Sequence, residues 1–382
     1  MFKIFPDDTM SPRERILTVI QLKVPDRVPI APTFGSHIAK AGGISEYELS
    51  TNGVKAALAA YRTWKRYGGV DMFNGTFLAD YLLPYPDSHS RFFFHWTMPT
   101  ETSHPYTLPQ LNEKCLLNDY DLLKQKGFLH FLRIEGAHIL SDLLHMAREA
   151  VQFFTLLNQL FPPTLFTEEF QAYAQSIVNH PADLLAFMRG IKNFLIDLRR
   201  QPATVKDLCD WMADGLTELG ILLLKLVKGN IVLYGCSRAS NTWISPKMFG
   251  ELFWDTMKRQ IWQLHKAGYL VCMHLDNDWT ENLEYFRELP KKCGFLHLDQ
   301  SDLFKAKDII GDHLCLMGNL DPATLRLASP KVVEKKCKAL IETCGEDGGY
   351  ILANACEVPI DAKFENILAM KRAIAKYGWY RA

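Results

Sequence analysis

Three side chains of the kinds that bind metal ions stand near the ends of two short apolar runs. His274 and Asp276 are two residues apart at the end of the run 269–275, and Cys356 follows the run 350–355. Alternate residues of a strand point to one face, so His274 and Asp276 leave it together. Three protein ligands with an open fourth position are typical of a catalytic zinc, which polarises a substrate oxygen or binds a thiolate. We therefore predict a catalytic zinc site at His274, Asp276 and Cys356.

A second pair with the same spacing, His297 and Asp299, ends the apolar run 294–298. This pair is either a rival metal site or a source of groups that orient the ligands of the first. A structural alternative stays open for the first set too. A histidine near a strand end is commonly a hydrogen-bonded structural residue, and a cysteine is commonly a small buried apolar group.

The elements that must position these residues follow a regular rhythm from residue 229 onward. Short apolar runs fall at 231–235, 269–275, 294–298, 314–318 and 350–355, and amphipathic helical stretches fall at 246–266, 280–289, 302–310 and 330–344. This alternation predicts parallel strands joined by right-handed crossovers. We expect an α/β fold, a single distorted TIM (β/α)8 barrel over residues 1–382, with its site at the C-terminal ends of the strands.

The N-terminal half has a less regular pattern. Ser11 and Glu14 have the spacing of a capping box, which predicts a helix to about residue 23. Strands are expected at 27–32 and 70–73, a helix at 45–67 and mostly helix over 137–228. Residues 77–127 are rich in aromatics, proline and histidine, and we interpret them as an insertion or lid that ends in a helix at 119–126.

Alternation along each strand also predicts which side chains point to the barrel axis. Where apolar residues alternate with polar ones, the apolar set is expected to face the helices. The expected inward set is Tyr234, Cys236, Cys272, His274, Asp276, His297, Asp299, Cys315, Met317, Asn319, Tyr350, Leu352, Asn354 and Cys356.

The substrate-binding candidates lie at strand ends or in the loops that follow strands. They are Phe34, His37, Asp71, Asn74, Trp279, Asp299, Asn319 and Asn354. Structural alternatives stay open for these residues, because a tryptophan such as Trp279 is a common packing residue and Asn319 could cap the following turn.

Composition excludes several classes of protein. Lys plus Arg and Asp plus Glu both number 43, and no basic stripe occurs, which argues against nucleic-acid binding. No apolar run reaches the roughly 20 residues needed to span a bilayer, and the N-terminus lacks a signal-peptide pattern. The nine cysteines include no C-x-x-C pair, which argues against a disulfide framework or a zinc knuckle. We expect a cytoplasmic protein.

Several segments resemble the uroporphyrinogen decarboxylase superfamily. They are residues 13–15, 26–29, 244–249, 316–325 (LMGNLDPATL), 329–334, 348–359 (GGYILANACEVP) and 364–367. The resemblance implies a single distorted barrel. True uroporphyrinogen decarboxylases carry an arginine-rich segment after the first strand, which binds the carboxylates of the substrate. Here residues 33–40 read TFGSHIAK, so that clamp is missing and porphyrin decarboxylation is disfavoured.

A second branch of the superfamily, the zinc- and corrinoid-dependent methyltransferases, uses a His-x-Cys pair after the fifth strand and a cysteine after the last strand. His274 and Cys356 match those places, and Asp276 stands where cysteine is commoner. The aromatic insertion and residues 118–123 (NDYDLL) resemble those of anaerobic O-demethylases.

The resemblance implies a corrinoid-dependent methyltransferase. It would move a methyl group from a small methylated donor, an aryl methyl ether, to the cobalt(I) of a corrinoid carried by a partner protein. Zinc would activate the leaving oxygen. Two other functions stay open: a cofactor-free decarboxylase and a non-catalytic barrel that binds a corrinoid or tetrapyrrole. A homodimer is a candidate assembly.

Overall fold

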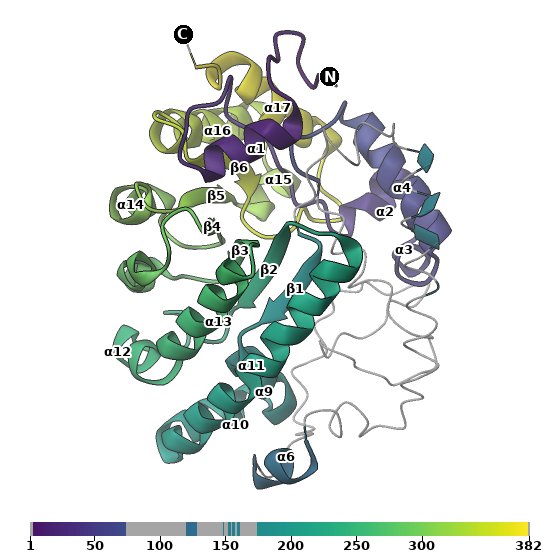
Figure 1. Ribbon diagram of the computed structural model, residues 1–382. Coiled ribbons are helices and arrows are strands. Elements are labelled where there is room, and N and C mark those ends of the chain that lie inside the picture. Colours follow the sequence, from purple (N-terminus) through teal and green to yellow (C-terminus); the bar gives the residue numbers. More distant parts are fainter. Residues whose placement is uncertain are drawn as a thin grey trace.

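The centre of the fold is a parallel sheet of six strands whose order in space follows their order in the chain. The structure, a computed structural model, describes residues 3–73, 120–127, a few positions between 148 and 160, and 174–380. The strands are β1 (Ser176–Asn179), β2 (Ile231–Cys236), β3 (Leu270–Leu275), β4 (Gly294–Leu298), β5 (Cys315–Leu320) and β6 (Tyr350–Asn354). Helices lie around the outside of this curved sheet (Figure 1). The described part is thus the strand–helix alternation of the predicted barrel, although its sheet is not closed among these residues.

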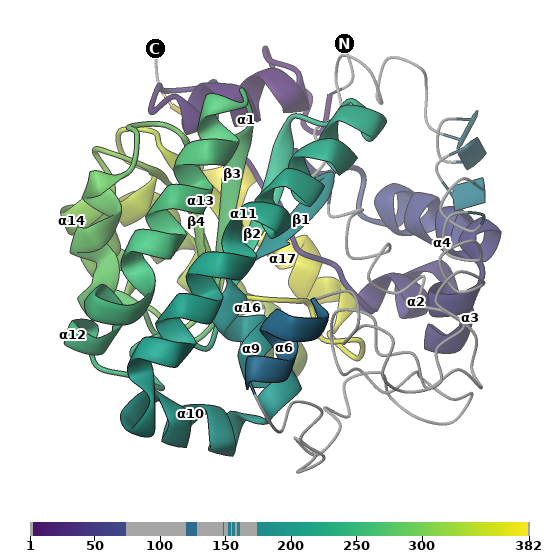
Figure 2. The same cartoon turned by 60° about the horizontal axis from the view of Figure 1, so that its bottom comes forward.

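Helices connect the strands and flank the sheet. They are α1 (Pro12–Ile20), α2 (His37–Gly42), α3 (Glu46–Thr51), α4 (Gly53–Arg66), α6 (Tyr120–Lys126), α9 (Pro181–Arg189), α10 (Ile191–Arg200), α11 (Pro202–Val227), α12 (Pro246–Phe249), α13 (Asp255–Lys266), α14 (Leu303–Ile310), α15 (Pro322–Leu327), α16 (Pro330–Cys344) and α17 (Phe364–Tyr377). A π-helical segment, η2 (Gly250–Trp254), joins α12 to α13, and a 3-10 helix, η3 (Thr280–Glu288), follows β3. Figure 2 shows α11 and α13 along the outer side of the sheet. None of the described helices has both the length and the apolar character needed to cross a membrane.

The strands predicted from residue 229 onward are confirmed, whereas β1 corrects the prediction of helix over this part of 137–228. Four residues are too few for a distinct period, and helix-forming sequence follows them. The predicted strand 27–32 contributes an isolated parallel bridge between Ile30 and Leu352 at the free edge of β6. The capping box is confirmed, since the Ser11 hydroxyl accepts from the Glu14 amide, but the helix ends at Ile20.

Two apolar cores lie on the two faces of the sheet. The inner core contains Leu233 and Cys272, and α1 closes it at the N-terminal ends of the strands with Ile16, Val19 and Ile20. The outer core fills the layer between the sheet and the helices.

The predicted orientation is confirmed for the β3, β4 and β5 strand residues and is wrong for β2 and β6. Ile231, Leu233, Ile351 and Ala353 belong to the inner core. Tyr234, Cys236, Tyr350 and Leu352 pack in the outer core instead, and Asn354 shares the outward parity of the last two. Both faces of a barrel strand are buried, so apolar residues occur on both and alternation gives no signal there.

A buried cluster of charges ties the N-terminal segment together. Arg27 contacts Asp8 and Asp71 at 2.7 Å each, and Arg15 of α1 contacts Asp26 at 2.6 Å. Burial disfavours the charge of Asp71, but the two guanidinium groups outweigh it and hold the pKa of that carboxyl below its usual range. Asp71 also accepts a hydrogen bond from the Ile30 amide at 2.8 Å, so it joins α1 to the chain segment that carries Ile30.

Candidate metal centre

The three predicted metal ligands converge at the C-terminal ends of the strands. His274 is near the end of β3, Asp276 follows that strand, and Cys356 follows β6. The Nε2 atom of His274 lies 3.1 Å from Asp276 Oδ1 and 3.8 Å from Cys356 Sγ. One ligand atom from each residue lies within 4.8 Å of the other two. A nitrogen, an oxygen and a sulfur donor are therefore grouped around one point, as a zinc ion requires.

A chain of hydrogen bonds fixes which nitrogen of His274 faces that point. The Nε2 atom of His297 lies 2.8 Å from the carbonyl oxygen of Asn354, which can only accept. Neutral His297 therefore donates from Nε2 and has a bare Nδ1, which lies 2.9 Å from Nδ1 of His274. His274 then donates from Nδ1, so its Nε2 lone pair points to Asp276 and Cys356. This is the tautomer that a metal ligand bound through Nε2 must have.

Electrostatics at this point favour a cation. Burial disfavours a charged His274, which is 6% exposed, but the carboxylates of Asp276, Asp299 and Glu357 outweigh burial and raise its pKa. Burial, followed by the charge of Asp276, raises the pKa of the Cys356 thiol well above its usual range. Burial lowers the pKa of His297 to about 3, which agrees with the uncharged His297 that the relay, this chain of hydrogen bonds, requires. The ligand atoms of His274, Asp276 and Cys356 all offer lone pairs to the same point, so they can lie this close together only with a proton or a metal ion between them.

The backbone around Asp276 is held by Trp279. The indole nitrogen of Trp279 donates to the Asp276 carbonyl oxygen at 2.8 Å, and the Trp279 amide donates to Ser301 Oγ at 2.8 Å. The ring is fully buried, and it meets Phe249 edge-on at 5.4 Å between centroids. The structure thus places Trp279 in the outer core, where it fixes the loop that carries Asp276.

Asn354 holds the loop that carries Cys356. Its Nδ2 donates to the Cys356 carbonyl oxygen at 2.8 Å, and its Oδ1 accepts from the Thr33 amide at 2.9 Å. The loop that carries Cys356 and the loop that carries Thr33 also meet at Gly35, where an added Cβ would lie 2.0 Å from Glu357 Oε2. The last strand and the first loop are therefore joined beside the candidate ligands.

Other predicted substrate residues lie near the site but have structural partners. Asn319 Nδ2 donates to the carbonyl oxygens of Ser301 at 2.7 Å and Asp299 at 3.1 Å. Asp299 is partly buried, and its Oδ2 accepts from the Asn277 amide at 3.0 Å. Burial and the nearby Asp276 raise the pKa of Asp299.

Phe34 and His37 lie in the outer core. Phe34 stacks on Tyr67 at 5.3 Å, and His37 Nε2 lies 2.7 Å from the Tyr67 hydroxyl. His37 Nδ1 lies 3.1 Å from the carbonyl oxygen of Pro359, and burial lowers its pKa to about 4. Asp71 belongs to the charge cluster beside α1. Asn74, like most of the 77–127 insertion, lies outside the described residues, whereas the predicted helix at 119–126 is present as α6.

The strand register reveals two positions that the sequence patterns did not. Asn179 pairs with Gly235, Gly235 with His274, and His274 with His297, so all four occupy one level of the sheet. The sequence patterns do not indicate Asn179, because β1 lies within residues 137–228, for which they predict mostly helix. The small residue at 235 was the available signal, since a glycine inside a strand often marks a close approach.

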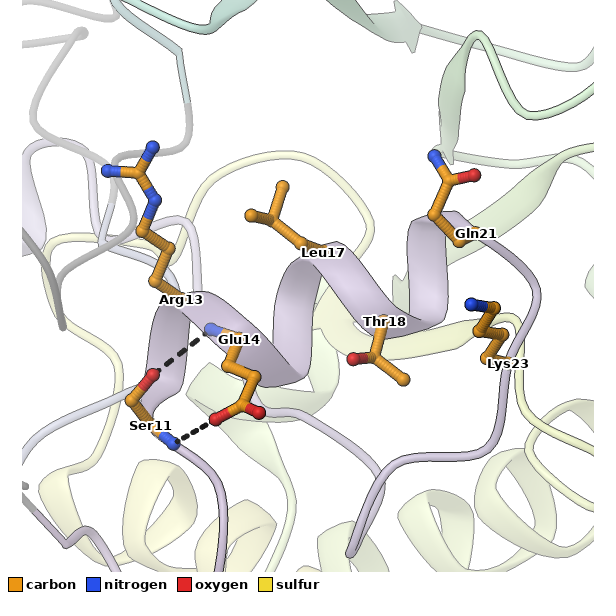
Figure 3. A pocket seen from close by; sticks show the side chains of 7 residues that line it. All are labelled: Ser11, Arg13, Glu14, Leu17, Thr18, Gln21 and Lys23. Carbon is orange, nitrogen blue, oxygen red and sulfur yellow. Dashed lines mark hydrogen bonds between the residues drawn. The ribbon is translucent and has the colours of Figure 1, made fainter.

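A surface hollow lies at the other end of the fold, over α1 (Figure 3). Its lining side chains come from α1 and the residues beside it: Ser11, Arg13, Glu14, Leu17, Thr18, Gln21 and Lys23. Since α1 closes the N-terminal ends of the strands, this hollow is separate from the centre around His274.

Comparisons with known proteins agree with this fold. The family described as uroporphyrinogen decarboxylase (URO-D) matches residues 174–377, more than half of the chain, so the chain belongs to that family. The chain is 30% identical over 77 residues to a uroporphyrinogen decarboxylase from Methylococcus capsulatus, a match that spans 20% of this chain and 22% of that protein. A methyltransferase from Methanosarcina mazei has a similar structure, with a TM-score of 0.65, 17% identity and coverage of 96% of this chain and 99% of that one. At that identity the likeness shows a shared fold, which supports the predicted barrel.

Proposed function

We propose that this chain is a zinc-dependent methyltransferase that moves a methyl group from a small methylated donor to the cobalt(I) of a partner corrinoid protein. The observation that carries the proposal is the convergence of His274 Nε2, Asp276 and Cys356, with the imidazole tautomer fixed by His297. The methyltransferase from Methanosarcina mazei, which shares the fold over nearly the whole chain, supports the same branch of the family.

The three side chains would hold the zinc ion at the mouth of the barrel, and zinc would act there as a Lewis acid toward the leaving oxygen. His297 keeps the His274 lone pair directed to the centre, and Trp279 keeps the Asp276 loop in place. With an aryl methyl ether as donor, the methyl group would pass to the cobalt(I) of the partner, while the ether oxygen would keep the bonding electron pair and take up a proton, which would give the phenol.

Decarboxylation of a polycarboxylate fits these residues less well. Residues 33–40 contain one lysine and no arginine, and Asp276, Asp299 and Glu357 bring negative charge to the centre. Like charges would raise the cost of binding a substrate with many carboxylates.

The test combines metal analysis with methyl transfer. Purified protein is expected to hold about one zinc per chain, as a single three-ligand site would. His274→Ala and Cys356→Ala should lose it, and Cys344→Ala, a buried cysteine of α16, is the matched control that should keep it. Transfer is then assayed with a cobalt(I) corrinoid protein against methoxylated phenols, methanol and methylamines. Zinc-free protein that decarboxylates, or corrinoid binding with no transfer from any donor, would overturn the proposal.

A further inference from the structure

The outer side of α11 carries four exposed leucines, here called the leucine stripe. They are between 39% and 70% exposed and are Leu219, Leu222, Leu223 and Leu226. Their spacing of three and four residues places them side by side on one face of the helix. The opposite face packs against β1, since a Cβ added to Gly220 would lie 2.2 Å from Val178 Cγ2. The leucine stripe therefore faces away from the barrel, and an exposed apolar patch of this kind marks an interaction site.

The leucine stripe is symmetric about the midpoint between Leu222 and Leu223. When a second copy of α11 lies antiparallel across that midpoint, Leu219 faces Leu226 of the second copy. In the same arrangement, Leu222 faces Leu223 of the second copy. Each leucine then meets a leucine, which is the self-complementarity that a two-fold interface requires.

Charged residues beside the leucine stripe match the same arrangement. Glu218 and Lys225 are both exposed, and their separation of seven residues places them on the same flank of the helix. In an antiparallel pair the same flanks of the two helices face each other, so Glu218 of each copy lies opposite Lys225 of the other. In a parallel pair, Glu218 would lie opposite Glu218 and Lys225 opposite Lys225. The charges therefore favour the antiparallel pair, as flanking charges do in paired helices.

We propose that a second copy of this chain covers the leucine stripe, in a two-fold dimer of antiparallel α11 helices flanked by pairs of Glu218 with Lys225. The inference does not depend on the proposed function. A single pair of helices makes an interface at the small end of the range for specific complexes, about 1,200 Å² in total. The dimer should therefore form reversibly and depend on protein concentration.

The position of the leucine stripe keeps the dimer away from the candidate metal centre. The helix α11 ends at Val227, and β2 begins at Ile231, so the stripe lies toward the N-terminal ends of the strands. The side chains of His274 and Cys356 lie at the C-terminal ends. Both copies can therefore admit a substrate or a protein partner at the mouth of the barrel while they are paired.

The first test measures the mass of the full chain by sedimentation over a series of concentrations. Wild-type protein should change from monomer to dimer as the concentration rises. Leu226→Glu should weaken dimerisation about 100-fold, because each interface would then bury two unpaired charges. Leu327→Glu is the matched control, since Leu327 ends α15 and is 71% exposed, against 70% for Leu226. Wild-type protein that stays monomeric throughout would overturn the inference and leave the stripe to a different partner, and a dimer that Leu226→Glu does not weaken would also overturn it.

The second test exchanges the flanking charges. Glu218→Lys alone and Lys225→Glu alone each place like charges opposite one another, so each should weaken dimerisation about 10-fold at low salt. The double variant reverses both charges and should restore the affinity of wild type. Far-UV circular dichroism should match wild type in every variant, which separates loss of the dimer from loss of the fold. A double variant that dimerises no more tightly than the single variants would overturn the antiparallel pairing.

Discussion

Nδ1 of His274 and Nδ1 of His297 lie 2.9 Å apart, and the carbonyl oxygen of Asn354 sets the direction of the proton between them. His297 on β4 donates to this backbone oxygen on β6, and His274 on β3 donates to His297. A backbone carbonyl in this way decides which lone pair faces Asp276 and Cys356.

Removing His297 should weaken zinc binding. His297→Phe keeps a ring in the core but leaves Nδ1 of His274 without an acceptor, and loss of such an outer partner costs about 10–100-fold in metal affinity. Competition with a chromophoric chelator measures the change. His313→Phe is the control, because His313 bonds to the Leu289 carbonyl oxygen at 2.8 Å away from the centre. Equal affinities for His297→Phe and wild type would show that the relay does not act on the metal.

Asp276 can be tested by exchange of its donor atom. Asp276→Cys should bind zinc more tightly, because thiolate is the softer ligand, and Asp276→Ala should bind it more weakly. Cobalt(II) substitution gives a direct readout, since the sulfur-to-cobalt absorption should grow with a second thiolate. If Asp276→Ala matches wild type in affinity and spectrum, then Asp276 is not a ligand.

Zinc affinity should rise with pH. The pKa of the Cys356 thiol is raised by burial and by Asp276, and the pKa of His274 is raised by neighbouring carboxylates against the effect of burial. Both groups must lose their protons to bind the ion, so protons compete with zinc and affinity should fall from about pH 8 to about pH 6. Calorimetry in buffers of different ionisation enthalpy counts the protons released. Cys356→Ser should release fewer, and a pH-independent affinity would contradict the ligand set.

Asp71→Asn should destabilise the fold without removing zinc. Breaking a buried ion pair on one side costs about 3–5 kcal/mol of unfolding free energy. The pKa of Asp71 is lower in the folded state than in the unfolded state, where it is about 4. The stabilisation is therefore fully present above about pH 4 and is lost as the pH falls through the folded-state pKa. Urea unfolding at neutral and acid pH should therefore show a gap between variant and wild type that narrows in acid.

Asp312→Asn is the control for Asp71→Asn, because Asp312 pairs with Arg287 on the surface, where water screens the charges and an ion pair contributes little to stability. A variant Asp71→Asn that kept its stability and changed only the KM of the donor would favour the substrate role predicted from the sequence.

The second half of the fold could be predicted because short apolar runs alternate there with amphipathic helical stretches. His274 and His297 carry the alternation that identifies the inward face. Alternation predicts the wrong face for Tyr234 and Tyr350, since their strands are apolar on both sides and only packing distinguishes the two faces. The four-residue β1 has no period of its own, and this hid Asn179.

Convergence of the metal candidates could be predicted from strand order alone, whereas the fate of single polar residues could not. His37 follows one predicted strand and Asp71 lies in another, near its end, as site residues of a barrel do. His37 bonds to Tyr67, and Asp71 pairs with Arg15 and Arg27. Each of these partners lies far away in the sequence, so no local pattern indicates the pairing.

The amide of Leu352 bonds to the carbonyl oxygen of Pro29, and the side chain of Asn354 bonds to Thr33, so the loop of Cys356 depends on both ends of the chain. During synthesis on the ribosome, a nascent chain that stops short of β6 has the imidazole and carboxylate but not the thiol. If the centre binds zinc as proposed, capture of the ion would have to wait until β6 is made and meets residues 29–33.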